Sequence, residues 1–271
     1  MSDTSTATPR SPRPARSRLA ALVRAEVILL RRNKLALFNA FVMPALPFLL
    51  LIPIRVNGNM DNETTSLFLG LVVALSLMFV IYYNLLSTFV SRREELVLKR
   101  LRSGECSDTE IIGGISIPAM AIGLIVFAFL GLLTVVALGQ PLPVNALLLL
   151  LAVVGGSLVF TGLALVTTII TKNSEAAQLT SLPIVLICMF GAGFSPLSAL
   201  PAWATTALRF TPLAPSYELT RLGWGGVTQN GRTVDLVDSF TQAALPAGIL
   251  LGWIVIAGFT AREYFRWEPR T

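Results

Sequence analysis

The segment that decides the fold runs from Arg92 to Glu110 and reads RREELVLKRLRSGECSDTE. It is a charged island between two long apolar segments, and it holds five of the 21 basic residues and five of the 15 acidic residues of the chain. An island of this kind is compatible with a plain solvated loop. Its first half, however, carries a pattern that favours a helix.

This pattern gathers apolar side chains on one side of a short helix. Three apolar residues fall on that face: Val97, Leu98 and Leu101. Glu95 precedes Lys99 by four residues, the order that favours an ion pair along a helix. A Ser-Gly pair at 103–104 ends the segment. We therefore expect a short amphipathic helix in the first half of the island.

Composition identifies the chain as a membrane protein. Apolar residues make up 54% and charged residues 13% of the chain, whereas soluble domains carry about 25% charged residues. A helix needs about 20 apolar residues to cross a bilayer. We expect spanning helices at 35–54, 67–90, 111–138, 144–171, 177–194 and 243–260. The predicted fold is an all-α membrane protein with six transmembrane helices.

The chain ahead of the first span has two parts. Residues 1–17 are rich in Ser, Thr, Pro and Arg, and such a composition cannot bury enough apolar surface to fold, which predicts a disordered basic arm. Residues 18–34 read as a basic amphipathic helix that lies along the inner membrane surface. Residues 35–271 then form one transmembrane domain.

Basic residues decide the orientation, because Lys and Arg are retained on the cytoplasmic side. Seventeen of the 21 fall on one side of six spans, in the N-terminal arm and helix, the loops at 91–110 and 172–176, and the C-terminal tail. The other side has four: Arg55, Arg209, Arg221 and Arg232. The sequence predicts a multi-pass protein of the cytoplasmic (inner) membrane, with both termini and the charged island in the cytoplasm.

The segment from Ser195 to Gln242 falls on the outer side and is too apolar for an ordinary loop. Prolines bracket a helix-length piece from Ala202 to Thr211. Three aromatic residues of the kind that favours membrane interfaces occur here: Trp203, Tyr217 and Trp224. We expect a partly re-entrant or interfacial hairpin between the fifth and sixth spans, and an outer loop packed on the helix ends is the alternative.

No motif in the chain indicates catalysis or nucleotide binding. Histidine is absent, and no Gly-x-x-x-x-Gly-Lys-Ser/Thr, Gly-x-Ser-x-Gly or His-Glu-x-x-His sequence occurs. We expect no catalytic residue, no metal and no cofactor in this chain. No ionisable residue lies near the middle of a predicted span, which argues against a proton-coupled pump or an ion channel. Energy for transport would have to come from another subunit.

Aromatic and hydroxyl side chains mark one face of the second predicted span. Tyr83, Ser87 and Ser76 share this face through their spacing, and Phe79 lies close by. Such a face is suited to a cavity for an amphipathic molecule, with rings for contact area and hydroxyls for orientation. Hydrogen bonding between helices is the alternative.

Residues 93–102, REELVLKRLR, resemble the Arg-Glu-x-Gly-Thr-Leu-Lys-Arg-Leu-Arg signature of ABC-2 type permeases. These are the membrane subunits of bacterial drug exporters related to the daunorubicin resistance permease. This chain has Leu96-Val97 where the signature has Gly-Thr, which leaves the subfamily and its cargo open. Further stretches similar to the family are RAE at 24–26, RRN at 31–33 with Pro44, and residues 194–203 and 212–218.

The resemblance implies a six-helix permease that dimerises with an identical or related copy and binds two ABC ATPase subunits. ATP and Mg²⁺ would belong to those subunits. Docking would use the helix between the second and third spans, a short element tied closely to both. The residues expected to couple the two subunits are Arg93, Glu94, Glu95, Leu98, Lys99, Arg100, Leu101 and Arg102.

The resemblance also implies export of a hydrophobic or amphipathic drug or antibiotic, with a lipid or lipid-linked glycan as the alternative cargo. An intramembrane enzyme acting on lipids is a rival hypothesis, for which the island offers five acids: Glu94, Glu95, Glu105, Asp108 and Glu110. Their basic neighbours favour an ion-pair network instead. A non-transporting scaffold or immunity protein is a third hypothesis.

Overall fold

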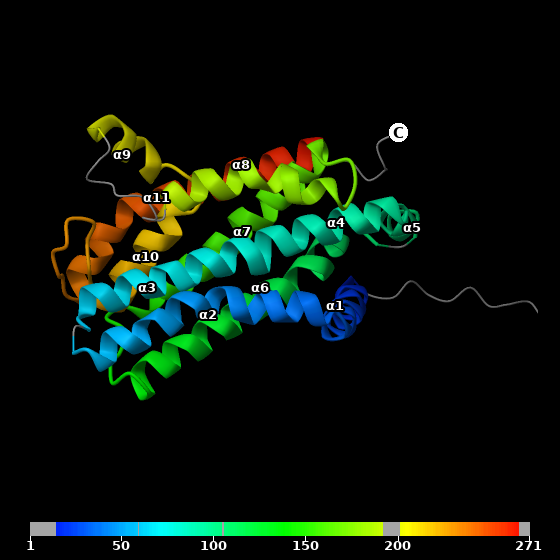
Figure 1. Cartoon of the computed structure of the whole chain (residues 1–271). Helices are drawn as coiled ribbons and strands as arrows, with labels where there is room; N and C mark the ends of the chain where they lie inside the picture. Colours follow the sequence, from blue (N-terminus) through cyan, green and yellow to red (C-terminus); the bar gives the residue numbers. More distant parts are fainter. Residues whose placement is uncertain (1–14, 59, 105, 192–200, 266–271) are drawn as a thin grey trace, which may run out of the picture.

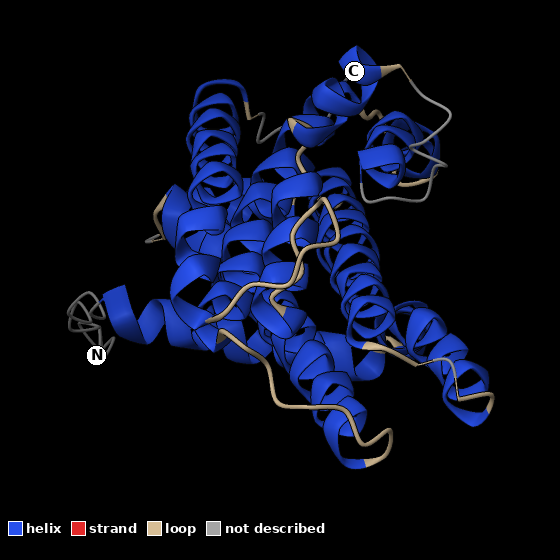
Figure 2. Cartoon of the chain, turned by 90° about the vertical axis from the view of Figure 1, so that its left-hand side faces the viewer, coloured by secondary structure: helices blue, strands red, loops and turns tan. Residues whose placement is uncertain are grey.

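The computed structural model describes residues 15–58, 60–104, 106–191 and 201–265. Regular structure in these ranges is helical, apart from one antiparallel bridge between Val227 and Thr233. Long helices run side by side as a bundle (Figure 1), and a view from one end shows the loops that connect them (Figure 2). The prediction of an all-α membrane protein is confirmed. Most of the predicted disordered arm lies outside the described residues.

Five helical stretches in the described ranges are long and apolar enough to cross a membrane. They are Leu37–Val56 within α2 (Lys34–Val56), Asn62–Glu94, α6 (Asp108–Val136), α7 (Ala146–Ile170) and α11 (Leu236–Tyr264). The remaining apolar helix, α8 (Ala176–Gly191), has 16 described residues, about 24 Å at 1.5 Å per residue. A bilayer core is about 30 Å thick. The crossing at 177–194 therefore stays a prediction, and its last residues lie outside the described ranges.

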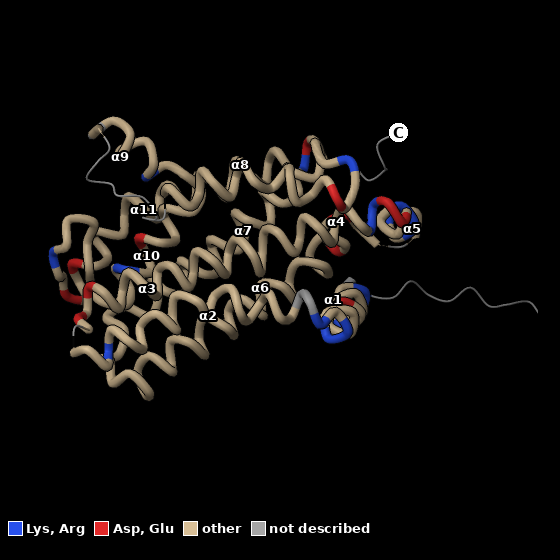
Figure 3. The backbone as a smooth tube through the Cα atoms, viewed as in Figure 1, with Lys and Arg blue, Asp and Glu red and all other residues tan. Residues whose placement is uncertain are grey.

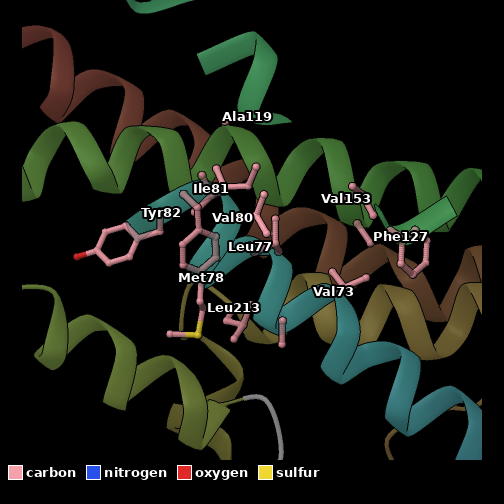
Figure 4. Close-up of a cluster of buried hydrophobic side chains, with 14 of the residues drawn as sticks. Val73, Leu77, Met78, Val80, Ile81, Tyr82, Ala119, Phe127, Val153 and Leu213 are labelled. Atoms are coloured by element: carbon pink, nitrogen blue, oxygen red, sulfur yellow. The ribbon is translucent and has the colours of Figure 1, made fainter. Parts of the chain in front are cut away.

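The second span is longer than predicted and is not a uniform α-helix. It consists of α3 (Asn62–Leu75), a π-helical segment η1 (Ser76–Tyr83) and α4 (Asn84–Glu94). Side chains of η1 fill the centre of the bundle (Figure 4). Two of them lie where neighbouring helices carry glycine: a Cβ on Gly156 would stand 2.6 Å from Leu77, and one on Gly123 would stand 3.2 Å from Ile81. Packing against these glycines holds the widened segment in the core.

Charged residues gather at the two ends of the bundle and leave its middle apolar (Figure 3). One end, the α5 end, carries α5 (Val97–Arg102), α1 (Ala15–Arg32) and the last turns of α11 (Figure 1). Helix α1 crosses this end and packs on α6, where a Cβ on Gly114 would lie 2.6 Å from Cβ of Leu22. The apolar face of α1 therefore covers a neighbouring helix as well as facing outward.

The opposite end, the α10 end, is closed by two short helices, α9 (Ala202–Arg209) and α10 (Ala214–Gly225). Helix α10 packs against α3, α7 and α11 and is buried along most of its length. Trp203 on α9 is 75% exposed, whereas Tyr217 and Trp224 on α10 are only 7% and 4% exposed. The expectation that all three aromatics serve the membrane interface is thus wrong for the two on α10. They belong to the core because α3, α7 and α11 surround α10.

Candidate coupling site

The chain changes direction at Leu96, between α4 and α5. Its backbone φ is 58°, and among the described residues it is the one with positive φ that is not glycine. A side chain strains the backbone in this left-handed region. The ABC-2 signature described above has Gly at this position, the residue that adopts such a φ without strain. Glu95 and Lys99 lie on opposite sides of the turn, so the expectation that they share one helix is wrong.

Arg93, three residues ahead of the turn, fastens α4 to the end of α7. Its side chain is almost fully buried, with 1% exposed. Nη1 donates to the carbonyl oxygen of Thr168 at 2.7 Å, and Nη2 donates to that of Thr171 at 2.6 Å. The last carbonyls of a helix lack partners within the helix, and a cation is favoured at that end. Arg93 supplies both the hydrogen bonds and the charge.

Glu94 makes a second link, to the loop between α7 and α8. Its Oε2 accepts the backbone N–H of Ser174 at 3.1 Å and also accepts the Ser174 hydroxyl. Adjacent residues of α4 therefore hold the end of α7 and the loop that leads to α8. A displacement of α4 would be passed to both.

Helix α1 is tied to the same region by two ion pairs that the sequence did not reveal. Arg92 pairs with Glu26 of α1, and Arg18 of α1 pairs with Glu110 of α6 at 3.2 Å. Burial raises the pKa of Glu26 above its ordinary value, although the guanidinium of Arg92 acts in the opposite direction. Arg92 therefore offsets only part of the penalty for burying this carboxylate. Residue spacing gives no sign of these pairs, because the partners are far apart in the sequence.

The start of α6 completes the site. Ser107 caps the helix: its hydroxyl accepts the N–H of Glu110 at 3.3 Å, and its own N–H donates to Oε2 of Glu110 at 2.7 Å. This is a capping box, which fixes the first turn. Arg102 at the end of α5 pairs with Asp108 at 3.2 Å, but both side chains are about half exposed. Such a pair contributes little stability in water.

The eight predicted coupling residues fall into two groups. Three have buried or partly buried side chains that hold α4 and α5 against the bundle: Arg93, Leu98 and Leu101. The others lie on the exposed side: Glu94, Glu95, Lys99, Arg100 and Arg102. Leu96 joins the exposed group with 41% of its side-chain surface accessible. This set, which we call the α5 surface, combines charges of both signs with one protruding apolar side chain.

The predicted cargo-lining residues do not converge on one cavity. Phe79 and Tyr83 lie on η1 and Ser87 lies on α4, and all three are partly exposed. Ser87 borders a groove of about 470 Å³ between α4 and the end of α1, which also includes Glu26 and polar residues of α4. Phe79 and Tyr83 do not line this groove. Ser76 is buried, and its hydroxyl donates to the carbonyl of Val72, so it turns away from the predicted face.

Comparison with known proteins agrees with this geometry. Residues 17–223, more than half of the chain, match the family model of the ABC-2 type transporter. The match covers most of α1, the whole charged island and most of α10. No curated protein matches the chain. Within the described ranges, no group of three or more His, Cys, Asp or Glu side chains could hold a metal ion.

Proposed function

Because the chain belongs to the ABC-2 type transporter family, we propose that it is the permease subunit of an ATP-driven exporter. In this proposal, it moves a hydrophobic or amphipathic small molecule, a drug or an antibiotic, outward across the cytoplasmic membrane. The chain is a multi-pass membrane protein and a transport component that works with an ATPase subunit. The proposed complex contains two ATPase subunits, which hold ATP and Mg²⁺, and two permease copies.

The observation that best supports this proposal is the α5 surface. It projects from one end of the apolar bundle, where charged residues gather (Figure 3), and the buried face of α5 and the adjacent end of α4 are fixed to the bundle through Leu98 and Arg93. A helix that is exposed on one side and anchored on the other is suited to passing the motion of a docked ATPase to α7 and α8. The distribution of basic residues favours the cytoplasm as the location of this end and of both termini.

Cargo would pass near the exposed side of the second span. The groove beside Ser87 is polar and opens next to α1, which suits the polar part of an amphipathic molecule. Phe79 and Tyr83 lie further along the same span and offer aromatic contact area. Contact with the second permease copy is the other role open to these two side chains, and a lipid remains the alternative cargo.

Charge reversal on the α5 surface tests the coupling role. We expect Lys99→Glu combined with Arg100→Glu to lower cargo-stimulated ATP hydrolysis by the assembled complex at least fivefold, since both charges would face the ATPase. Both residues are exposed, so insertion and folding should be unchanged. Arg232→Glu is the matched control, because Arg232 is also exposed but lies at the α10 end. Normal stimulation in the double variant would remove the coupling role.

A further inference from the structure

A large cavity at the α5 end plays no part in the proposed coupling. It has a volume of about 770 Å³ and lies between α7 and α11, with the first residues of α6 at its mouth. Small-molecule sites in proteins typically enclose about 300–1,000 Å³. The cavity is therefore large enough for a ligand of substantial size.

The lining changes from polar to apolar along the helices. Ser107 and Thr109 of α6 and Arg262 of α11 lie at the mouth. Leu158 of α7 and Ile254 of α11 line the far end. An occupant that matches this gradient has a polar head and an apolar tail.

One buried hydroxyl between these two zones has no partner. Thr161 lines the cavity and is 8% exposed, and its Oγ1 makes no hydrogen bond within the described part of the chain. A buried hydroxyl without a hydrogen bond is unfavourable. Thr161 is adjacent to Gly162, which contacts Ala257, five residues before Arg262. Because α7 and α11 run parallel, Thr161 lies about 9 Å deeper than Arg262 along the helix axis.

The length of the cavity matches one leaflet of a bilayer. Its lining on α11 extends from Ile254 to Phe265, about 16 Å at 1.5 Å per residue. Half of a bilayer core is about 15 Å.

The charge at the mouth suits an anion. Asp108 is the acidic residue in the lining, and it is already paired with Arg102. Glu110 in the same turn is paired with Arg18. Glu263 neighbours Arg262 in sequence but is not part of the lining. The Ser107 hydroxyl donates to Oε2 of Glu110, so Arg262 and the Thr109 hydroxyl are the groups of the lining that can meet an anion at the opening.

We propose that this cavity binds one phospholipid of the adjacent leaflet. Its phosphate lies at Arg262 and at the hydroxyl of Thr109. The Thr161 hydroxyl donates to an ester carbonyl of the glycerol backbone. One acyl chain lies in the groove along α7 and α11 and extends toward Ile254. This inference requires insertion into a membrane but not docking of an ATPase or transport of cargo.

Filling the cavity tests the proposal. A Cβ added at Gly258, which lines the cavity, would meet nothing within 4 Å, so Gly258→Leu should be accommodated and occupy the space of the acyl chain. Gly252→Leu is the matched control: it lies on the same helix, its Cβ also meets nothing within 4 Å, and it is outside the cavity lining. The full chain is purified in mild detergent, incubated with phosphatidylglycerol, and examined by native mass spectrometry.

We expect the unaltered chain and Gly252→Leu to retain one phospholipid per chain, and Gly258→Leu to retain at least tenfold less. Arg262→Gln and Thr161→Val should each weaken retention several-fold, and they keep the test valid if Gly258→Leu does not fold. Equal retention by all variants would overturn the proposal. So would a loss of dimers in Gly258→Leu without any loss of lipid, which would assign the cavity to a second copy of the chain. Failure of ATPase coupling would leave these measurements unaffected.

Discussion

At the α5 end, three neighbouring charged residues of one helix tie three separate elements to it, whereas at the α10 end the polar ties are spread over several helices around the buried helix α10. Arg93, Glu94 and Arg92 of α4 hold α7, the loop before α8, and α1. A displacement of α4 would therefore be passed to all three elements that it holds. At the α10 end, Asn62 donates to the carbonyl oxygen of Gly225 and Asn145 donates to Oγ of Ser239. Arg221 of α10 pairs with Glu63 at 3.7 Å, and α10 is enclosed by α3, α7 and α11. The contrast suits an end that receives motion and an end that seals the bundle.

The largest effect should come from removing the buried guanidinium at the α5 end. Arg93→Ala eliminates two charge-assisted hydrogen bonds and leaves the carbonyls of Thr168 and Thr171 buried. We expect a loss of about 3 kcal/mol or more in the free energy of unfolding. The readout is thermal unfolding in detergent, followed by the reaction of Cys188 with a maleimide dye in a Cys106→Ser background, because Cys188 is fully buried.

Arg100→Ala is the control for this variant, since Arg100 is exposed on the neighbouring helix. It should change stability by less than about 0.5 kcal/mol. If Arg93→Ala were as stable as Arg100→Ala, the hydrogen bonds between α4 and α7 would not contribute to stability. The contrast between the two ends would then fail.

Adding a methyl group at Gly223, at the α10 end, should cause the second largest loss of stability. The Cβ of Gly223→Ala would lie 2.9 Å from both the carbonyl oxygen of Asn145 and Cδ2 of Leu149. Overpacking of this kind costs about 1–3 kcal/mol. Gly248→Ala, whose Cβ meets nothing within 4 Å, is the control, and the same thermal assay applies. Equal stability of the two variants would show that the α10 end tolerates rearrangement.

The ion pair between α1 and α4 should give a smaller effect that depends on pH. Arg92→Ala leaves the Glu26 carboxylate buried without its cation, and we expect a loss of about 1–3 kcal/mol at neutral pH. Because the pKa of Glu26 is raised, its carboxyl takes up a proton at a higher pH than an ordinary glutamate does. The neutral form needs no cation beside it. The loss should therefore shrink as the pH falls through the pKa of Glu26.

Glu26→Gln in the Arg92→Ala background supplies the control, because it removes the charge at every pH. This double variant should be more stable than Arg92→Ala alone near neutral pH, and its stability relative to the unaltered chain should vary less with pH. A loss in Arg92→Ala that is constant with pH would exclude the buried carboxylate as its cause.

The smallest change in stability is expected at Leu96. Leu96→Gly relieves about 1–2 kcal/mol of backbone strain but costs about 0.5–1 kcal/mol because the unfolded chain gains conformational entropy, so the net gain should be at most about 1.5 kcal/mol. Leu96→Ala keeps the strain and removes only the protruding side chain. If the α5 surface docks an ATPase, both variants should weaken that association, although only the glycine variant gains stability. Unchanged association would exclude Leu96 from the surface.

The sequence predicted the elements that depend on local composition. Apolar runs located five stretches in the described ranges that are long enough to span a membrane, and the apolar pattern of the island anticipated α5 with Leu98 buried. The glycines of α6 and α7 are sites of close approach between helices. Each of these features is encoded by residues near one another in the chain.

Features that depend on distant partners were not predictable. Arg93 looks like its charged neighbours in the sequence, and it is buried because the end of α7 offers two carbonyls. The π-helical segment η1 contains neither Gly nor Pro, so none of its own residues marks it in the sequence, and its side chains pack against Gly123 and Gly156 of other helices. The turn places Leu96 at a positive φ, which residues with a side chain disfavour. The one indication of this turn in the sequence is the Gly that the ABC-2 signature has at this position.

Copurification tests most directly whether the chain works with an ABC ATPase. The tagged chain is purified from its own host in several mild detergents, and the proteins that copurify are identified. We predict a stoichiometric ABC ATPase subunit with the unaltered chain, and its loss in the Lys99→Glu, Arg100→Glu variant but not in Arg232→Glu. Recovery of intact permease without any ATPase under all of these conditions would contradict the account.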